Sequence, residues 1–225
     1  MDWQAIALSV RLALLTTLVL VVLGTPIAYW LAFSSRRWKF LVEAVVALPL
    51  VLPPTVLGFY LLLAMSPRSP LGAAYLRLTG STLPFSFQGL LAASVLYSLP
   101  FAVQPFAAGF AAVDRRLIEA SWSLGVSRGR TFVRIVLPLA RPALLTGMVL
   151  AFAHTLGEFG VVLMVGGNLA GVTRTVSIAI YDDVQALDYA AAGATAFLLL
   201  AVSFVVLAVT YGLQRRAGAT WPLRW

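Results

Sequence analysis

Cysteine is absent from the sequence, and lysine and histidine occur once each, as Lys39 and His154. Without cysteine, disulfides and thiolate-ligated metal sites are excluded. A P-loop needs a lysine after a glycine-rich turn, and Lys39 lies in SSRRWKF with no glycine near it. The chain also contains no G-x-G-x-x-G stretch. We therefore expect it to bind no cofactor of its own and not to hydrolyse ATP.

Charged residues are also scarce, at 11% of the 225 residues, while 61% are hydrophobic and the mean hydropathy is +0.94. A soluble domain of this length could not bury so much apolar surface in one core. Segments of ~20 apolar residues, which cross a bilayer core about 30 Å thick, account for the composition. We expect an all-α, polytopic transmembrane bundle with five spans, at Leu12–Phe33, Phe40–Met65, Gly89–Ala112, Pro142–Val165 and Ala190–Leu213.

The basic residues are distributed unevenly between the segments that connect these spans. Twelve of the sixteen lie on one side: Arg36, Arg37, Lys39, Arg115, Arg116, Arg128, Arg130, Arg134, Arg141, Arg215, Arg216 and Arg224. Positive charge accumulates on the cytoplasmic side, so we expect the N-terminus outside and the C-terminus inside. Because the basic residues follow membrane topology and form no soluble basic face, nucleic acid is not an expected partner.

The stretch EASWSLGVSRGRTFVRIVLP, residues 119–138, interrupts the apolar runs between the third and fourth predicted spans. Together with the residues before it, this stretch predicts a first short helix over 115–124, with Asp114 as its N-cap and Gly125 as its left-handed stop. A second short helix is expected over 128–136, with Ser127 as its N-cap. Pro138 then closes the second helix. A helix as short as the first is marginal alone in water, so it must pack on something. From its composition, a protein partner and the lipid headgroups are both open.

Residues 125–129 also read G-x-S-x-G, the form of a hydrolase nucleophile elbow, so an intramembrane serine hydrolase is an alternative class. That motif has meaning only at a strand-to-helix turn, and the residues before Gly125 look helical. No acid separates Ser127 from His154, so the order of a catalytic triad is not met. The pattern favours a helix stop followed by a serine N-cap.

His154 and Glu158 lie four positions apart in the fourth predicted span, so on an uninterrupted helix they would share a face. They cannot complete a metal site, because the chain has no further histidine or cysteine. An ionisable group in the middle of a membrane costs at least ~2.5 kcal/mol and normally faces protein or water. The pair therefore either lines an aqueous path or packs between helices.

Residues 119–138 resemble the EAA loop of the permease subunits of binding-protein-dependent ABC importers. Glu119-Ala120-Ser121, Gly125 and the closing Ile135-x-Leu137-Pro138 carry this resemblance, with Ser121 in place of the usual alanine. The resemblance implies a coupling helix that docks into a cleft of an ATPase subunit. It also implies that Glu119 forms a salt bridge with the ATPase and that Gly125 makes the turn after the helix. The packed contact with the ATPase would be made by Ala120, Ser121 and Leu124.

The resemblance covers nearly the whole chain, as a single type I importer permease domain of residues 1–225, and narrows to the molybdate permease subunits. It is carried by LPLVLPPTVLGFYLLL at 48–63, LAFAHTLGEFGVVLMVGGN at 150–168 and TRTVSIAIYDDVQ at 173–185. Sulfate permease subunits share much of the GEFG region, and tungstate has nearly the size and charge of molybdate. Sulfate and tungstate therefore stay open as substrates.

The partners follow from the same resemblance. It implies a homodimer in the cytoplasmic membrane, two cytoplasmic ATPase subunits that bind ATP and Mg²⁺, and an external binding protein that delivers the anion. A fixed cationic pocket would hold a dianion too tightly, so we expect hydroxyls, backbone N–H groups and helix ends in the path. The candidates for the path are Thr55, His154, Glu158 and Asn168.

Arg174 is expected to be a solvated arginine on an external loop. An ion-coupled secondary transporter, working through Glu158 and without an ATPase, is the remaining alternative class.

Overall fold

The structure, a computed structural model, describes residues 1–219 of the 225, with side chains placed through residue 212. Its helices are α1 (Trp3–Phe33), α2 (Lys39–Val51), α3 (Pro54–Met65), α4 (Pro70–Thr79), α5 (Phe87–Ala111), α6 (Arg115–Ser123), α7 (Arg128–Thr131), the π-helix η1 (Phe132–Val136), α8 (Leu137–Leu156), α9 (Gly160–Gly166), α10 (Val176–Gln185) and α11 (Tyr189–Ala219). Residues 1–219 contain no strand, which confirms the all-α expectation.

Five of these helices begin at a polar residue whose side chain accepts a hydrogen bond from an amide of the first turn. The caps are Asp2 for α1, Ser69 for α4, Ser86 for α5, Asp114 for α6 and Asp188 for α11. Each cap satisfies one of the backbone donors that a helix N-terminus leaves without an intrahelical partner. Side-chain chemistry that is legible in the sequence therefore sets these five boundaries.

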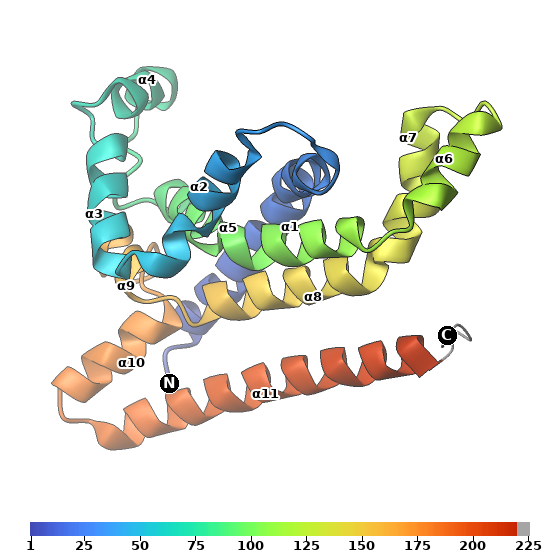
Figure 1. The fold of residues 1–225 in the computed structure, drawn as a ribbon. Coiled ribbons are helices and arrows are strands. Elements are labelled where there is room, and N and C mark those ends of the chain that lie inside the picture. Colours follow the sequence, from blue (N-terminus) through green and yellow to red (C-terminus); the bar gives the residue numbers. More distant parts are fainter. Residues whose placement is uncertain (220–225) are drawn as a thin grey trace.

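The centre of the molecule is a layer in which α1, α5 and α8 lie side by side (Figure 1). Leu20 of α1 and Val103, Phe106 and Phe110 of α5 are completely buried in it. Helices in a membrane gain their packing energy from close approach, which small residues permit. At Gly147 of α8, an added Cβ would lie 2.6 Å from the Phe106 ring.

The first, third and fifth predicted spans correspond to long helices that are apolar enough to cross a membrane. Their boundaries differ by one or two residues for α5 and at the start of α11. Helix α1 begins nine residues before the predicted start, because Asp2 caps it and Arg11 lies within it. Together with Arg128–Leu156, these helices make four candidate spans, or five if the bent pair described next is one span.

The second predicted span, Phe40–Met65, consists of two helices. Helices α2 and α3 meet at an angle of 114°. Leu52 is extended, as the residue before a proline tends to be, and Pro54 is the first residue of α3. Pro49, by contrast, is accommodated inside α2. The consecutive prolines at 53 and 54 thus break the span rather than only distorting it.

The fourth predicted span, Pro142–Val165, is wrong at both ends. Helix α8 stops at Leu156, and a new short helix, α9, starts at Gly160. At its other end, α8 continues from α7 through η1 without interruption, so Arg128–Leu156 forms one long helical segment. The break falls at Gly157, which ends α8 close to the buried Glu158.

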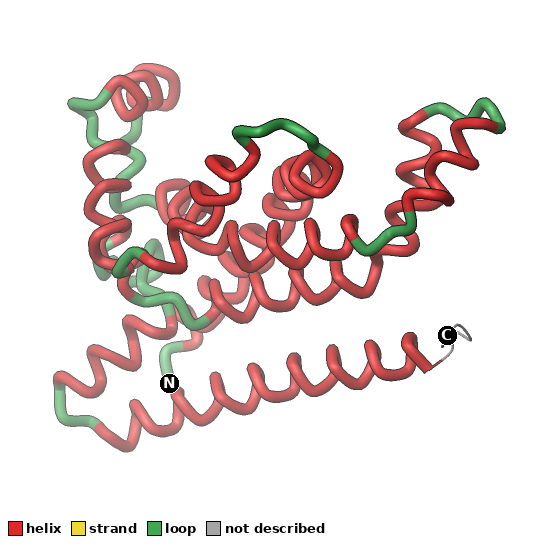
Figure 2. The backbone as a smooth tube through the Cα atoms, in the orientation of Figure 1, coloured by secondary structure: helices red, strands yellow, loops and turns green. Residues whose placement is uncertain are grey.

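The two ends of the molecule differ in character. Helices α6 and α7 project from one end of the central layer, and the far end of α11 lies at the same end (Figure 1). The N-terminus lies near α10 at the opposite end (Figure 1). Figure 2 shows the two helix breaks, between α2 and α3 and between α8 and α9, as loop segments close to each other. The projecting helices α6 and α7 and the two helix breaks therefore lie in different parts of the molecule.

Candidate functional site

The projecting helix α6 is amphipathic, with one face on the protein and one face free. Ile118 and Ser121 are buried, whereas Leu117 is 48% exposed and Leu124, just beyond the last turn, is 83% exposed. Ala120 lies on the exposed side as well. Large apolar side chains left open at a projecting tip are typical of a contact surface for a partner.

The turn after α6 has the predicted geometry. Asp114 accepts a hydrogen bond from the Arg116 amide at 2.9 Å, so the predicted N-cap is confirmed. Gly125 has φ +75°, a left-handed conformation that suits glycine. The Val126 amide donates to the Ser121 carbonyl and the Gly125 amide to the Trp122 carbonyl, as in a helix C-terminal motif. The chain can therefore reverse into α7 within four residues.

Ser121 points into the protein, away from the free face of α6. Its hydroxyl lies 2.9 Å from the Thr131 hydroxyl of α7, and both side chains are buried. Thr131 also donates to the Ser127 carbonyl at 3.1 Å. The hydrogen bond between Ser121 and Thr131 ties the two short helices together, so Ser121 holds α6 in place while Ala120 and Leu124 remain accessible.

Glu119 lies on the exposed part of α6, beside several arginines. No lysine, arginine or histidine among the described residues lies within 4.0 Å of its carboxylate as an ion-pair partner. Arg128 lies over the Trp122 ring at 5.6 Å instead. The Glu119 carboxylate is therefore free to pair with a charge outside this chain.

The second helix was predicted to end at about residue 136, before Pro138, and this predicted end is wrong. Ser127 stands at the N-cap position, although its side chain makes no capping hydrogen bond. Beyond it, α7 passes into η1 and then into α8, with Pro138 inside the continuous segment. The Leu137 amide donates to the Phe132 carbonyl, five residues back. This wider turn makes room for the Pro138 ring, which in an α-helix would clash with a carbonyl four residues before it.

The hydrolase alternative is also wrong. Helix α6 precedes Gly125, and residues 1–219 contain no strand that could form a nucleophile elbow. His154 makes its hydrogen bond with Ser98 and not with Ser127. The G-x-S-x-G match is a turn between two short helices.

The Ser121–Thr131 contact gives a testable prediction. Ser121→Ala should destabilise the protein by only about 0.5–1.5 kcal/mol, because Thr131 keeps its bond to the Ser127 carbonyl. Ser121→Leu should cost about 1–3 kcal/mol and displace α6, because the site is buried and already packed. Thermal unfolding of the purified protein measures both. Equal unfolding temperatures for the two variants would contradict the inward orientation of this side chain.

A cavity of about 470 Å³ lies where the two helix breaks meet. Its lining comes from the start of α3, from α5, from the end of α8 and from α9: Pro54, Thr55, Tyr97, His154, Gly157, Glu158, Phe159, Gly160, Leu163 and Met164. Three of the four residues predicted for a path, Thr55, His154 and Glu158, therefore lie around one cavity. Sequence reasoning missed Tyr97, which lies in an apolar span of α5 with no signal of its own.

The polar groups around this cavity are held in different ways. His154 Nδ1 lies 2.9 Å from the Ser98 hydroxyl, and its ring is stacked on Phe101 at 3.9 Å. Ser98 also contacts the Thr155 hydroxyl at 2.8 Å. Glu158 is only 4% exposed, and neither of its carboxylate oxygens has a hydrogen bond within the described part of the chain. Histidine is thus fixed, whereas the glutamate is buried without a partner.

Asn168, the fourth predicted path residue, is not among the residues that line the cavity. It is exposed, accepts a hydrogen bond from Arg174 Nε at 2.7 Å and donates one to Asp182 at 2.7 Å. Arg174 also pairs with Asp182 at 3.3 Å and with Asp2 at 3.8 Å. The expectation of a solvated Arg174 is wrong, because this cluster ties the start of α1 to α10.

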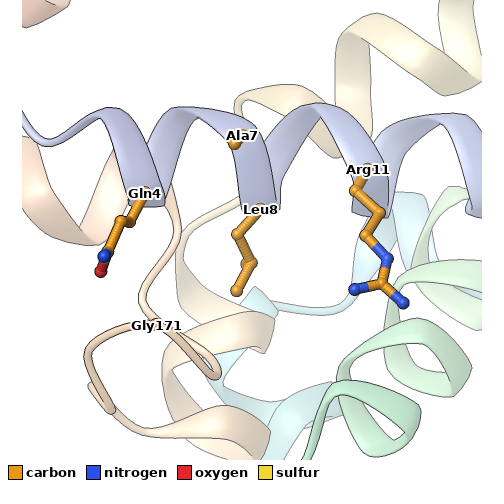
Figure 3. A pocket seen from close by; sticks show the side chains of 5 residues that line it. All are labelled: Gln4, Ala7, Leu8, Arg11 and Gly171. Atoms are coloured by element: carbon orange, nitrogen blue, oxygen red, sulfur yellow. The ribbon is translucent and has the colours of Figure 1, made fainter.

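A second hollow lies at the N-terminal end of α1, near this cluster. Gln4, Leu8 and Arg11 project from successive turns of α1 toward the loop that contains Gly171 (Figure 3). The Arg11 guanidinium lies 4.5 Å from the centre of the Phe87 ring, a cation–π contact. The hollow is lined mainly by α1 side chains, and its lining residues include no cluster of catalytic or metal-ligating groups.

The described chain is a bundle of helices of which several are long and apolar enough to cross a membrane, and its family is that of membrane permeases. The chain matches the family of binding-protein-dependent transport system inner membrane components over residues 24–218, and it belongs to that family. It is 52% identical over 214 residues, 95% of either chain, to the molybdenum transport system permease protein ModB of Azotobacter vinelandii. It is also 38% identical to the protein of that name from Escherichia coli (strain K12), over 82% of this chain and 80% of that one.

Solved structures show the same fold. A chain of the bacterial alginate ABC transporter, in complex with an alginate pentasaccharide-bound periplasmic protein, superposes with a TM-score of 0.76 at 19% identity. The match covers 95% of this chain and 78% of that chain. A chain of the inward-facing MetNI methionine ABC transporter gives 0.71 at 14% identity, over 96% and 95% of the two chains. At these identities the likeness concerns the fold alone.

Proposed function

We propose that this chain is the permease subunit of an ABC importer for molybdate. The observation that carries the proposal is the 52% identity, along 95% of both chains, to a molybdenum transport permease. Residues 1–225 then form one type I importer permease domain in the cytoplasmic membrane. Tungstate and sulfate are the alternative substrates, because both are tetrahedral dianions of similar chemistry.

The orientation and the partners belong to the same proposal. The N-terminus and the α10 end face outward, where a binding protein delivers the anion, and the α6–α7 end faces the cytoplasm. Two copies of the chain form the path, and two separate ATPase subunits bind ATP and Mg²⁺. The free face of α6, with Leu117, Ala120 and Leu124, supports docking into an ATPase cleft. Glu119 supplies a carboxylate that forms no ion pair with any of the described residues.

Transport then proceeds by alternating access. Closure of the ATPase pair on ATP carries the two copies of α6 together, and the rigid segment from α7 to α8 transmits this movement to the membrane interior. Helix α8 ends at the cavity that holds Thr55, His154 and Glu158. A movement of α6 therefore reaches the wall of the proposed path along one helical segment.

Reconstitution tests the proposal. The permease is purified with its cognate ATPase, placed in liposomes, and supplied with its binding protein loaded with radioactive molybdate. We expect molybdate to accumulate only when ATP is present on the ATPase side, and tungstate to compete more strongly than sulfate. Accumulation driven by an ion gradient without ATP would instead establish a secondary transporter and overturn the proposal.

A further inference from the structure

Two half-helices start side by side at the cavity. Gly160 of α9 lies against Pro54 of α3, so that a Cβ at Gly160 would be 2.7 Å from the Pro54 Cβ. About one turn further along, Gly58 packs on Met164 in the same way, with an added Cβ again 2.7 Å from the Met164 Cβ. The two breaks in the membrane-embedded helices are thus locked together, and the start of α3 opens on the cavity that Thr55 lines.

The N-terminus of α3, a helix of 12 residues, lacks the side-chain cap that α1, α4, α5 and α6 have. Its N-cap is Pro53, and the Val56 and Leu57 amides donate to the Pro53 carbonyl. Thr55 is exposed on the open side of the cavity, and its amide and hydroxyl have no hydrogen-bond partner in the part of the chain that the structure describes. Free donors at a helix N-terminus attract an anion, an effect that is strongest away from bulk water.

Glu158 is the second, independent observation at this place. It is 4% exposed and lines the same cavity, and its two oxygens are without partners. The Ser94 hydroxyl lies close enough to interact with this carboxyl, but not in the geometry of a full hydrogen bond. His154 and Tyr97 are the other titratable groups around the cavity, and none of the described lining residues is a lysine or arginine. An ionised carboxylate buried without a cation is strongly disfavoured, whereas a protonated carboxyl can donate a hydrogen bond.

We propose that this cavity is a transient binding site for a tetrahedral oxyanion, in which Glu158 acts as a neutral hydrogen-bond donor together with the Thr55 amide and hydroxyl. The inference rests on the proposed function and assigns the residues that hold the cargo during passage. All the donors are uncharged, so the anion is stabilised without a fixed counter-charge. A site that binds weakly enough to release its ion is what conduction requires.

Uptake by the reconstituted complex, with its ATPase and molybdate-loaded binding protein, tests the site. Glu158→Gln keeps a neutral donor of the same shape and should stay within about twofold of the wild-type rate. Glu158→Leu has no donor and should reduce uptake at least tenfold. Glu43→Gln, at the exposed Lys39–Glu43 ion pair, is the matched control and should leave uptake unchanged. Thr55→Val should reduce uptake more than Thr55→Ser, which keeps the hydroxyl.

A second readout separates this role from a structural one. The number of ATP molecules hydrolysed per molybdate imported should rise in Glu158→Leu, because the ATPase still cycles while the anion fails to pass. Wild-type uptake by Glu158→Leu, or an equal loss in Glu158→Gln and Glu158→Leu, would overturn the inference. If the wild-type complex imports sulfate rather than molybdate, the proposed substrate fails, and the same variant series decides the site with sulfate. If it imports no oxyanion, both proposals fail.

Discussion

Exchange of Leu124 for aspartate is expected to release the ATPase subunits while the permease stays folded. Leu124 is 83% exposed at the tip of α6, so its removal costs the fold almost nothing. In a docked complex the same side chain would be buried, and hot-spot apolar residues contribute about 2–4 kcal/mol to an interface. The affinity for the ATPase should therefore fall roughly 30- to 1000-fold. Co-purification of the two subunits, followed by titration, measures the loss.

Leu78→Asp is the matched control for this experiment. Leu78 is 86% exposed, on helix α4, and α4 is not part of the α6–α7 end. Its replacement adds the same charge and removes the same side chain, yet it should leave the ATPase bound. If Leu124→Asp retains the ATPase at wild-type affinity, α6 is not the docking helix. Equal losses in both variants would point to a general defect in assembly.

Glu119→Lys should abolish ATP-driven uptake. The carboxylate lies on the exposed side of α6 without a partner in the described chain, so in the complex it can pair with a basic residue of the ATPase. Charge reversal replaces that attraction by repulsion between two like charges, and truncating one member of a buried charge pair already costs about 2–5 kcal/mol. We expect uptake to fall at least about 30-fold, measured with radioactive substrate in the reconstituted complex.

Two other variants define the cause of that loss. Glu119→Gln, which removes the charge without reversing it, should give an intermediate rate. Asp183→Lys makes the same exchange on α10, at the opposite end of the molecule, and should keep the ATPase bound. Full uptake by Glu119→Lys would exclude a salt bridge at this position and leave docking to the apolar residues.

The sequence predicts most strongly those elements whose boundaries depend on local chemistry. Asp114 and Gly125 bound α6 because a side-chain acceptor and a left-handed φ act within one turn. The prolines of the second span predict a distortion, but neither its angle nor the break after Leu156 was predicted, because hydropathy counts apolar residues and takes no account of direction. Pro53 and Pro54 turn the chain by 114° inside an unbroken apolar run. Pro138 had the opposite outcome, because a π-turn before it absorbs the clash.

The candidate cavity, too, was predicted in part from the sequence. Thr55, His154 and Glu158 were predicted because polar groups in apolar spans are costly and must face protein or water. That argument cannot say which of them meet, since the meeting depends on two helix breaks about a hundred residues apart in the chain. Asn168, which follows the fourth predicted span, was predicted for the path as well, and it instead binds Arg174 and Asp182. Ser98, which fixes the His154 ring, carries no charge and gave no signal.

The π-turn at Phe132–Val136 affects how a movement of the projecting helices is transmitted to α8. It stands between the helices that project from the molecule and the long helix that ends at the cavity. Each residue of an α-helix advances about 100° around the axis, so the surplus residue of a π-turn offsets the angular phase of the two flanking segments. The segment from α7 to α8 is therefore continuous and rigid, and the π-turn sets which face of α8 follows a movement of α7 in the membrane interior.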